Sequence, residues 1–361
     1  MRIAIDAREL TGHPTGVGRY LSELLREWQA AGIDRRHTLQ LYAHTPPTLV
    51  PPGLVATVDV VPGAGGTRWE QWDLPRALGR ARPDVVFAPG YTAPLAAPAP
   101  TVVAIHDVSF FAHPEWFAWR EGARRRLVTT WSARRARLVL APSAFSGAEI
   151  VRHTAVDPAR VRVVYLGVRS PATPATDRRA PVVLFVGSLF QRRRLDVLIA
   201  AFARVAVTHP EARLEIVGAN RTTPRVDFAA ALSAHGLGDR ARLRDWVDDA
   251  TLDRLYREAA VFVFLSRYEG FGFTPLEAMA HGAVPIVLDT PVAREIYGAA
   301  AWRVPDGPAL TTDVATAMAA LLDDDAQHAR FRAEAAPVLA RYDWAETARQ
   351  ALGCLEEAAG A

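Results

Sequence analysis

The stretch VFVFLSRYEGFGFTPLEAMAH, residues 261–281, carries most of the information about the fold class. It begins with an apolar run, residues 261–265, which has the length of a buried strand. It then passes through Gly270 and Gly272, and it ends in residues 274–281, which we predict to form a helix. A buried strand, a glycine-containing turn and a helix together make the unit from which parallel α/β sheets are built.

The same alternation of short apolar runs and helix-length segments extends over nearly the whole chain, so we predict two parallel α/β domains. Residues 167–181 contain three prolines and no apolar periodicity, which is typical of a linker. We therefore expect domains at residues 1–168 and 169–340, followed by a helical tail at 341–361, with a ligand cleft between the domains. Strands are predicted at residues 2–6, 38–42, 56–61, 85–88, 101–105, 138–141 and 161–165, and then at 182–186, 213–217, 241–245, 261–265 and 284–288.

Composition excludes several classes of protein. The chain has 361 residues, half of them apolar, which suits two folded domains and rules out a disordered chain. Its single cysteine, Cys354, excludes a disulfide framework and a cysteine-based metal site. No apolar run approaches the roughly 20 residues that span a bilayer. We expect a cytoplasmic protein, with a peripheral position on the inner face of the membrane as the second option.

The basic residues are unusual because all 42 are arginine. Without lysine, anion binding falls to guanidinium groups and backbone amides. The formal net charge of +3 is too small to indicate nucleic-acid binding. Residues 120–137 hold seven arginines among Trp119, Leu127 and Trp131. This segment predicts either a surface for an anionic membrane or phosphorylated acceptor, or a solvated helix face.

Two carboxylates flank the glycines of the opening stretch. Glu269 follows the predicted strand and Glu277 lies about one turn into the predicted helix, so both could face one ligand. Carboxylates accept hydrogen bonds from the vicinal hydroxyls of sugars and riboses. The alternative is that Glu277 stabilises the start of a helix and Glu269 is a loop charge.

A second glycine turn, at Gly187, precedes Arg192, Arg193 and Arg194 at the start of the next predicted helix. Adjacent arginines repel one another unless an anion neutralises them, so we predict that this segment binds an anion such as a diphosphate. The alternative is a solvated helix start.

Two features of the first domain also suggest ligand contacts. Gly16 and Gly18 precede an amphipathic helix but lack the third glycine of a dinucleotide fingerprint, so we predict a flexible loop over a phosphate or an acceptor. His106 lies at the carboxyl tip of the strand predicted at 101–105, the edge where open α/β sheets bind ligands. A structural histidine is the alternative.

In this combination and order the chain resembles the retaining GT-B glycosyltransferases of family 4. The resemblance rests on Glu269 and Glu277, which resemble the family's E-x7-E motif, and on residues 186–202, 16–18, 105–107 and 142–150. It implies two facing Rossmann-like domains with a cleft between them and a nucleotide-sugar donor held mainly by the C-terminal domain, whereas the N-terminal domain takes the acceptor. It also implies that the final helix packs back on the N-terminal domain.

The resemblance assigns roles to residues of this sequence. It implies that Glu269 contacts the donor sugar, Glu277 holds the ribose diol, and His106 lies beside the transferred sugar. It further implies donor contacts for Arg192 and Arg193 at the diphosphate, for Gly16, Gly18 and Gly187, and for the backbone at Gly270, Phe271, Gly272 and Phe273. Arg193 stands where the family usually has lysine, so a planar fork replaces a point charge. The nucleobase pocket is expected near Gly218 and residues 245–247.

We therefore predict a metal-independent retaining hexosyltransferase without a cofactor that acts on a glycan or lipid-linked acceptor and does not bind nucleic acid. The N-terminal patterns IDAREL and TGVGRY resemble the mannosyltransferase branch, which makes GDP-mannose the first donor to test. Alternatives are a nucleotide-sugar epimerase or a phosphorylase on the same fold, or a non-catalytic glycosyltransferase-like binding protein.

Overall fold

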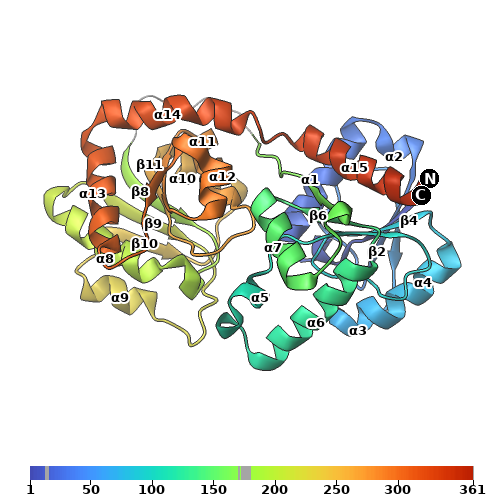
Figure 1. The fold of residues 1–361 in the computed structure, drawn as a ribbon. Helices are drawn as coiled ribbons and strands as arrows, with labels where there is room; N and C mark the ends of the chain where they lie inside the picture. The colour runs from blue at the N-terminus through green and yellow to red at the C-terminus, as the bar shows by residue number, and fades with distance from the viewer. Residues whose placement is uncertain (13–15, 170, 172–179, 361) are drawn as a thin grey trace. The chain divides into compact units, whose positions relative to one another are not determined.

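The computed structural model describes residues 1–12, 16–169, 171 and 180–360. The chain forms two compact units, one made of Met1–Gly167 with Tyr342–Ala361 and the other of Val168–Arg341 (Figure 1). Each unit is built on its own parallel sheet. The linker predicted at 167–181 lies largely outside the described residues.

The first unit holds a seven-stranded sheet in the order β3-β2-β1-β4-β5-β6-β7. Ile3 of β1 lies opposite Leu39 on one side and Val85 on the other. The central strands are buried on both faces, because helices cover both sides of a parallel sheet. The strands are β1 (Arg2–Asp6), β2 (Thr38–Ala43), β3 (Ala56–Val60), β4 (Val85–Ala88), β5 (Thr101–Ala104), β6 (Leu138–Ala141) and β7 (Val161–Val163).

The helices of this unit include the C-terminal helix α15 (Trp344–Gly360), which joins it from the end of the chain. Trp28 Nε1 in α1 donates a hydrogen bond to the carbonyl of Ala348 at 2.9 Å, and Thr347 Oγ1 donates to the carbonyl of Tyr165 at 2.8 Å. The helical tail predicted at 341–361 is therefore present, and it belongs to the first unit. The other helices are α1 (Gly16–Ala30), α2 (Ile33–Arg36), α3 (Gly66–Arg68), α4 (Leu74–Ala81), α5 (Ser109–Ala112), α6 (Trp119–Arg135) and α7 (Ala144–Thr154). Short 3₁₀ turns η1 (Arg8–Leu10), η3 (Pro114–Trp116) and η4 (Pro158–Arg160) and a π-helical turn η2 (Trp69–Asp73) complete it.

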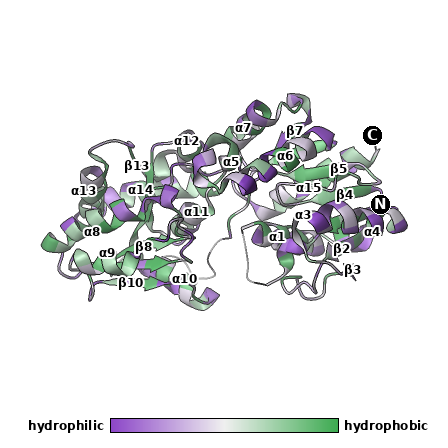
Figure 2. Cartoon of the chain, turned by 90° about the horizontal axis from the view of Figure 1, so that it is seen from below, coloured by the Kyte–Doolittle hydropathy of each residue, from purple (hydrophilic) through white to green (hydrophobic). Residues whose placement is uncertain are grey.

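The second unit holds a six-stranded sheet in the order β10-β9-β8-β11-β12-β13. Its core strands are almost wholly apolar, and Figure 2 shows β8 and, in the first unit, β4 in the green of hydrophobic residues. The strands are β8 (Ala180–Val186), β9 (Arg213–Val217), β10 (Ala241–Arg244), β11 (Ala259–Phe264), β12 (Val284–Leu288) and β13 (Trp302–Val304). The helices are η5 (Gln191–Arg193), α8 (Leu195–Thr208), α9 (Phe228–Ala234), α10 (Asp249–Glu258), α11 (Phe273–Ala280), α12 (Pro291–Tyr297), η6 (Gly298–Ala300), α13 (Leu310–Asp323) and α14 (Asp325–Leu339).

The predicted α/β class with two parallel sheets is confirmed, and the predicted strands are all present with ends that differ by one or two residues. The short edge strand β13 was not predicted, because three residues are too few to show a periodic pattern.

The strand order fixes where each unit can bind a ligand. In the second unit the chain builds β9 and β10 on one side of β8, and β11, β12 and β13 on the other. The direction in which strands are added to the sheet thus reverses after β10. In such sheets ligands bind outside the carboxyl ends of the strands, between the two strands where this direction reverses. The reversal lies between β8 and β11, and between β1 and β4 in the first unit.

Candidate functional site

The loops that follow β8 and β11 meet at the point of reversal in the second unit. Gly187 and the turn η5 follow β8, whereas Glu269 and Gly270 lie in the loop after β11. The backbone N–H of Arg267 donates to the carbonyl of Arg192 at 3.0 Å, which ties the loops together. Two motifs separated in sequence by about 76 residues, the distance from Arg193 to Glu269, are therefore neighbours in space.

Glu269 is held in one orientation because three donor atoms contact the same carboxylate oxygen, Oε1. Arg193 Nε and Nη2 each lie 3.0 Å from Glu269 Oε1, and Ser266 Oγ donates to that oxygen at 2.8 Å. The side chains of Glu269 and Arg193 are only 16% and 13% exposed. Such packing leaves a fixed carboxylate beside the glycine loop, which suits it to accept hydrogen bonds from a polyhydroxylated ligand.

The three adjacent arginines have different surroundings. Arg193 also donates from Nη1 to the carbonyl of Ser188 at 3.0 Å, and its guanidinium lies 4.9 Å from the ring centre of Phe264. Arg194 pairs with Asp306 at 3.2 Å, and Arg192 lies over the ring of Phe190 at 4.4 Å. Glu269 and Asp306 thus neutralise Arg193 and Arg194 without a bound anion, so repulsion among the arginines does not by itself require one, and binding of an anion by this segment stays a prediction. The sequence did not indicate Asp306, which belongs to a loop far along the chain.

Glu277 is buried in α11 and its carboxylate has a protein donor. Tyr256 Oη, from α10, donates to Glu277 Oε2 at 2.9 Å. A buried carboxylate needs such donors, because burial without them is costly. The ring of Tyr256 stacks on His281, whose Nε2 lies 3.0 Å from Asp253. Sequence reasoning missed Tyr256, whose only signal is its place beside Leu255 in the segment that forms α10.

Gly272 has a conformation that the site requires. Its φ of +88° lies in the left-handed region, and a Cβ there would collide with Tyr297 Oη, which donates to the carbonyl of Gly272 at 3.0 Å. Gly272 immediately precedes Phe273, the first residue of α11, so backbone N–H groups of the first helical turn face the loop after β11. In that turn, Thr274 Oγ1 is buried and has no hydrogen-bond partner among the described residues. Gly218 and residues 245–247 follow β9 and β10, at the same edge of the sheet.

His106 follows β5 in the first unit and is half-buried. Its Nε2 lies 2.8 Å from the carbonyl of Pro89, and a carbonyl only accepts, so Nε2 carries a proton and Nδ1 of the neutral ring is an acceptor. Burial lowers the pKa of His106 below its ordinary value, against the opposing effects of Pro89 and Asp107. Tyr20 and Tyr91 make T-shaped contacts with the imidazole, with ring centres 4.8 and 5.7 Å away.

Gly16 and Gly18 are not in a flexible loop, so that part of the prediction is wrong. Both belong to the first turn of α1, and Gly18 is buried there. The buried residues that follow, among them Tyr20, Leu21 and Leu24, belong to the same helix. Residues 13–15, which directly precede Gly16, lie outside the described residues.

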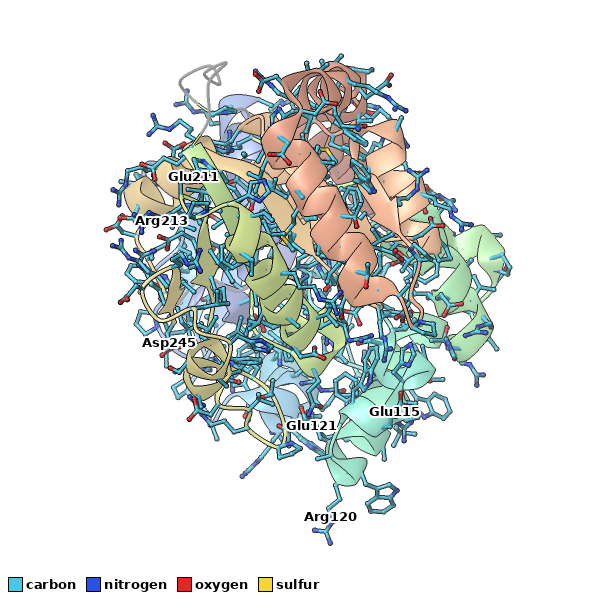
Figure 3. The ribbon with its side chains drawn as sticks, turned by 90° about the vertical axis from the view of Figure 1, so that its left-hand side faces the viewer. Glu115, Arg120, Glu121, Glu211, Arg213 and Asp245 are labelled. Carbon is cyan, nitrogen blue, oxygen red and sulfur yellow. The ribbon has the colours of Figure 1, made fainter. Side chains whose placement is uncertain are left out.

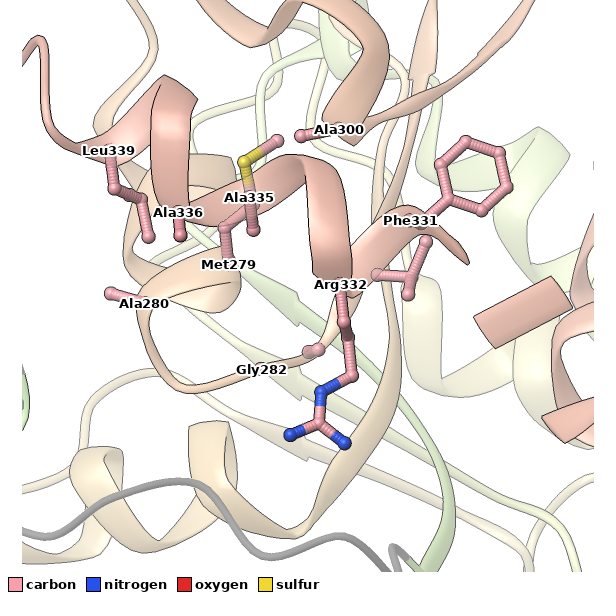
Figure 4. A pocket seen from close by; sticks show the side chains of 11 residues that line it. Met279, Ala280, Gly282, Ala300, Phe331, Arg332, Ala335, Ala336 and Leu339 are labelled. Carbon is pink, nitrogen blue, oxygen red and sulfur yellow. The ribbon is translucent and has the colours of Figure 1, made fainter. Parts of the chain in front are cut away.

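A cavity of about 180 Å³ lies between α11 and α14, lined by Met279, Phe331, Arg332 and Leu339 among others (Figure 4). It adjoins the C-terminal end of α11, whereas Glu269 and Gly272 lie at its N-terminal end, so it is separate from the candidate site. Within the part of the chain that the structure describes, no group of three or more His, Cys, Asp or Glu residues could hold a metal ion. No helix among those residues is both long and apolar enough to cross a membrane.

Comparisons with known proteins agree in both units. A family model described as Glycosyltransferase Family 4 matches residues 14–170, and one described as Glycosyl transferases group 1 matches residues 180–324. A curated relative, GDP-mannose:cellobiosyl-diphosphopolyprenol alpha-mannosyltransferase of Komagataeibacter xylinus, is 30% identical over 258 residues, which are 68% of this chain and 64% of the relative. D-inositol 3-phosphate glycosyltransferase 2 of Catenulispora acidiphila is 33% identical over 55% of this chain and 51% of its own length. The chain thus spans between about half and two thirds of these relatives.

A solved structure shows the same fold over the whole chain. HepE of Anabaena, in complex with UDP-glucose, superposes with a TM-score of 0.75 at 19% identity and covers 99% of this chain and 100% of its own. Three findings agree with the motifs at Glu269 and Glu277. They are the two family models, which together cover both units, the curated relative at 30% identity, and the likeness of fold. The chain belongs to family 4 of the glycosyltransferases with the GT-B fold.

Proposed function

We propose that this protein is a retaining glycosyltransferase that moves a hexose from a nucleotide diphosphate sugar to a hydroxyl of a glycan or lipid-linked acceptor. The observation that carries the proposal is the position of Glu269. Its carboxylate is fixed by Arg193 and Ser266 beyond the carboxyl ends of the neighbouring strands β8 and β11, which is the edge at which such sheets bind nucleotides.

The proposed roles follow from charge and position. Glu269 would accept hydrogen bonds from hydroxyls of the donor sugar, and Glu277 would accept those of the ribose, with Tyr256 orienting its carboxylate. Arg192 and the first-turn amides of α11 would stabilise the leaving diphosphate. Arg193 would then act through Glu269, because its guanidinium already contacts Glu269 and Ser188.

The proposed reaction breaks the bond between the anomeric carbon and the diphosphate oxygen, and forms a bond from that carbon to the acceptor oxygen. The acceptor proton passes to the departing diphosphate. His106, with Nδ1 as acceptor, would hold a hydroxyl of the transferred sugar. We propose that arginine and amide donors replace a metal at the diphosphate, so that the reaction is metal-independent.

GDP-mannose is the donor we propose. Support comes from the Komagataeibacter relative, whose name states that donor. UDP-glucose is the competing donor for the test, since it is bound in the Anabaena structure. The name of the Catenulispora relative states an inositol phosphate, which is a polyol that carries a phosphate. An inositol phosphate is therefore a candidate acceptor for the test.

The test combines binding and turnover. A thermal-shift panel of GDP, UDP, ADP, dTDP and their sugars identifies the base, because a ligand that binds the folded state raises its apparent stability. Proton NMR of the product with the matching sugar then reports whether the anomeric configuration is retained. Conversion of the donor without an acceptor would indicate an epimerase. A need for inorganic phosphate would indicate a phosphorylase, and stabilisation without any product would indicate a binding protein.

A further inference from the structure

Helix α6 of the first unit exposes large apolar side chains on one face. Trp119, Leu127 and Trp131 are 78%, 61% and 48% exposed. At 3.6 residues per turn their directions fall within about 120° of one another. The opposite face packs on the unit through Gly122, Thr129, Ser132 and Ala133. Exposed tryptophans grouped in this way mark a contact surface rather than an ordinary solvated helix.

The same face is strongly basic. Exposed arginines alternate with the apolar residues, and Figure 3 shows Arg120 extending from the beginning of α6 into solvent. Glu121 is the one acidic residue of the segment 119–137, and it already pairs with Arg125 at 2.6 Å. Arg124 donates to Thr67 and Arg134 to the carbonyl of Thr154, which are neutral partners. The surface therefore keeps a large positive charge. Its exposed arginines are Arg120, Arg124, Arg134, Arg135 and Arg137, whereas Arg125 lies about 180° round the helix from the centre of this face and pairs with Glu121.

A cavity lies where α6 ends. It has a volume of about 380 Å³ and is lined by Arg135, Arg137 and Arg160 together with Pro94, Leu95 and Ala97. Arg160 Nη1 donates to the carbonyls of Arg134 and Ala136 at 2.9 and 3.0 Å, which fixes this arginine at the end of the helix. Thr101 also lines the cavity and begins β5, so the cavity is at the amino edge of the sheet, opposite the edge that carries His106. The cavity thus offers three guanidinium groups and an apolar wall.

We propose that the exposed face of α6 and this cavity form a docking surface for an anionic phospholipid membrane. Arginines on an amphipathic surface attract lipid phosphates. Tryptophan prefers the level of the head groups, because there its apolar ring contacts the acyl chains while its N–H group stays in contact with water. The cavity takes one head-group phosphate between Arg135, Arg137 and Arg160. A leucine that is 61% exposed suits a lipid interface better than a polyanion in water such as nucleic acid. The proposal goes beyond the transfer reaction and does not depend on it.

The experiment measures flotation of the full-length protein with two kinds of vesicle, one of phosphatidylcholine and one of phosphatidylcholine and phosphatidylglycerol in equal parts. One variant combines Arg120→Gln, Arg135→Gln and Arg137→Gln; another combines Trp119→Ser and Trp131→Ser. The matched control removes the same charge from the second unit, with Arg213→Gln, Arg242→Gln and Arg330→Gln, three exposed arginines outside the proposed surface. Because all substituted side chains are exposed, the thermal midpoint of each variant should stay near that of the wild type.

We expect the wild type to bind the anionic vesicles in preference to the neutral ones and to be released by salt, because surface charges are screened. One arginine near an anionic surface changes partitioning about fivefold, so the triple variant should bind about a hundredfold more weakly. The tryptophan variant should also bind more weakly, and the control should bind like the wild type. Equal binding to both vesicles, or a triple variant that matches the control, would overturn the proposal in favour of a solvated helix face. Tighter binding to duplex RNA than to anionic vesicles would overturn it in favour of a nucleic-acid surface. None of these results depends on transferase activity, so failure of either proposal leaves the other to be judged separately.

Discussion

The ion pair between Arg193 and Glu269 allows a quantitative prediction. Two guanidinium nitrogens contact Glu269 Oε1 at 3.0 Å, and neither side chain is more than 16% exposed. Exposed pairs contribute about 0–1 kcal/mol, whereas breaking a fully buried pair costs about 3–5 kcal/mol. For this mostly buried pair we expect Arg193→Gln alone to destabilise the second unit by about 2 kcal/mol, which lowers its thermal midpoint by about 4–8 °C for a unit of this size. Glu269→Gln should cost somewhat less, because the amide oxygen can still accept a hydrogen bond.

The assay is a double-mutant cycle measured by scanning calorimetry on the full-length protein. Removing both charges leaves neither of them buried without its partner, so the double variant should be less destabilised than the two single effects combined. The exposed pair Arg349–Glu346, in α15, provides a matched cycle in which the coupling should be much smaller. If the effects of Arg193→Gln and Glu269→Gln add within about 0.5 kcal/mol, the two side chains are not coupled and Arg193 does not position Glu269.

Further predictions concern the ligand, the metal and pH. Glu277→Ala should weaken binding of the free nucleotide by about 10- to 150-fold in calorimetry, because losing a charge-assisted hydrogen bond costs about 1.5–3 kcal/mol; wild-type affinity would show that Glu277 does not hold the ribose. Glu269→Ala should leave nucleotide binding nearly intact and depress turnover in transfer kinetics, since sugar contacts matter most as the ring distorts; full turnover would make Glu269 a loop charge. Turnover should survive EDTA, and a loss that manganese restores would contradict metal independence. Burial lowers the pKa of His106, so as the pH falls through about 6.5 the unfolded chain binds that proton first and stability falls. The thermal midpoint should drop less between pH 7.5 and pH 5.5 in His106→Gln than in the wild type. An equal drop would show that His106 does not cause the loss of stability at low pH.

The pattern of the sequence was sufficient for the fold class and for the place of the motifs on it. Strands buried on both faces, such as β8 and β11, appear as continuous apolar runs. Glycines and charged residues that directly follow such runs must lie at the carboxyl edge of the sheet. For that reason Gly187, Glu269 and His106 could be placed at strand ends without coordinates. The first-turn position of Gly16 and Gly18 was misjudged, because glycine favours loops but is tolerated where a helix packs closely.

What the sequence by itself determined is therefore local: which segments are strands and helices, and which functional side chains follow them. Which side chains meet across distant loops was decided by the tertiary structure. The contacts of Glu269 with Arg193, of Arg194 with Asp306 and of Glu277 with Tyr256 join segments that lie between 21 and 112 residues apart. Periodicity describes one element at a time, and it contains no information about how far a side chain of a neighbouring element reaches. Electrostatic neutralisation depends on that distance, so the same three arginines that appear in the sequence as one anion site have three different surroundings in the folded protein.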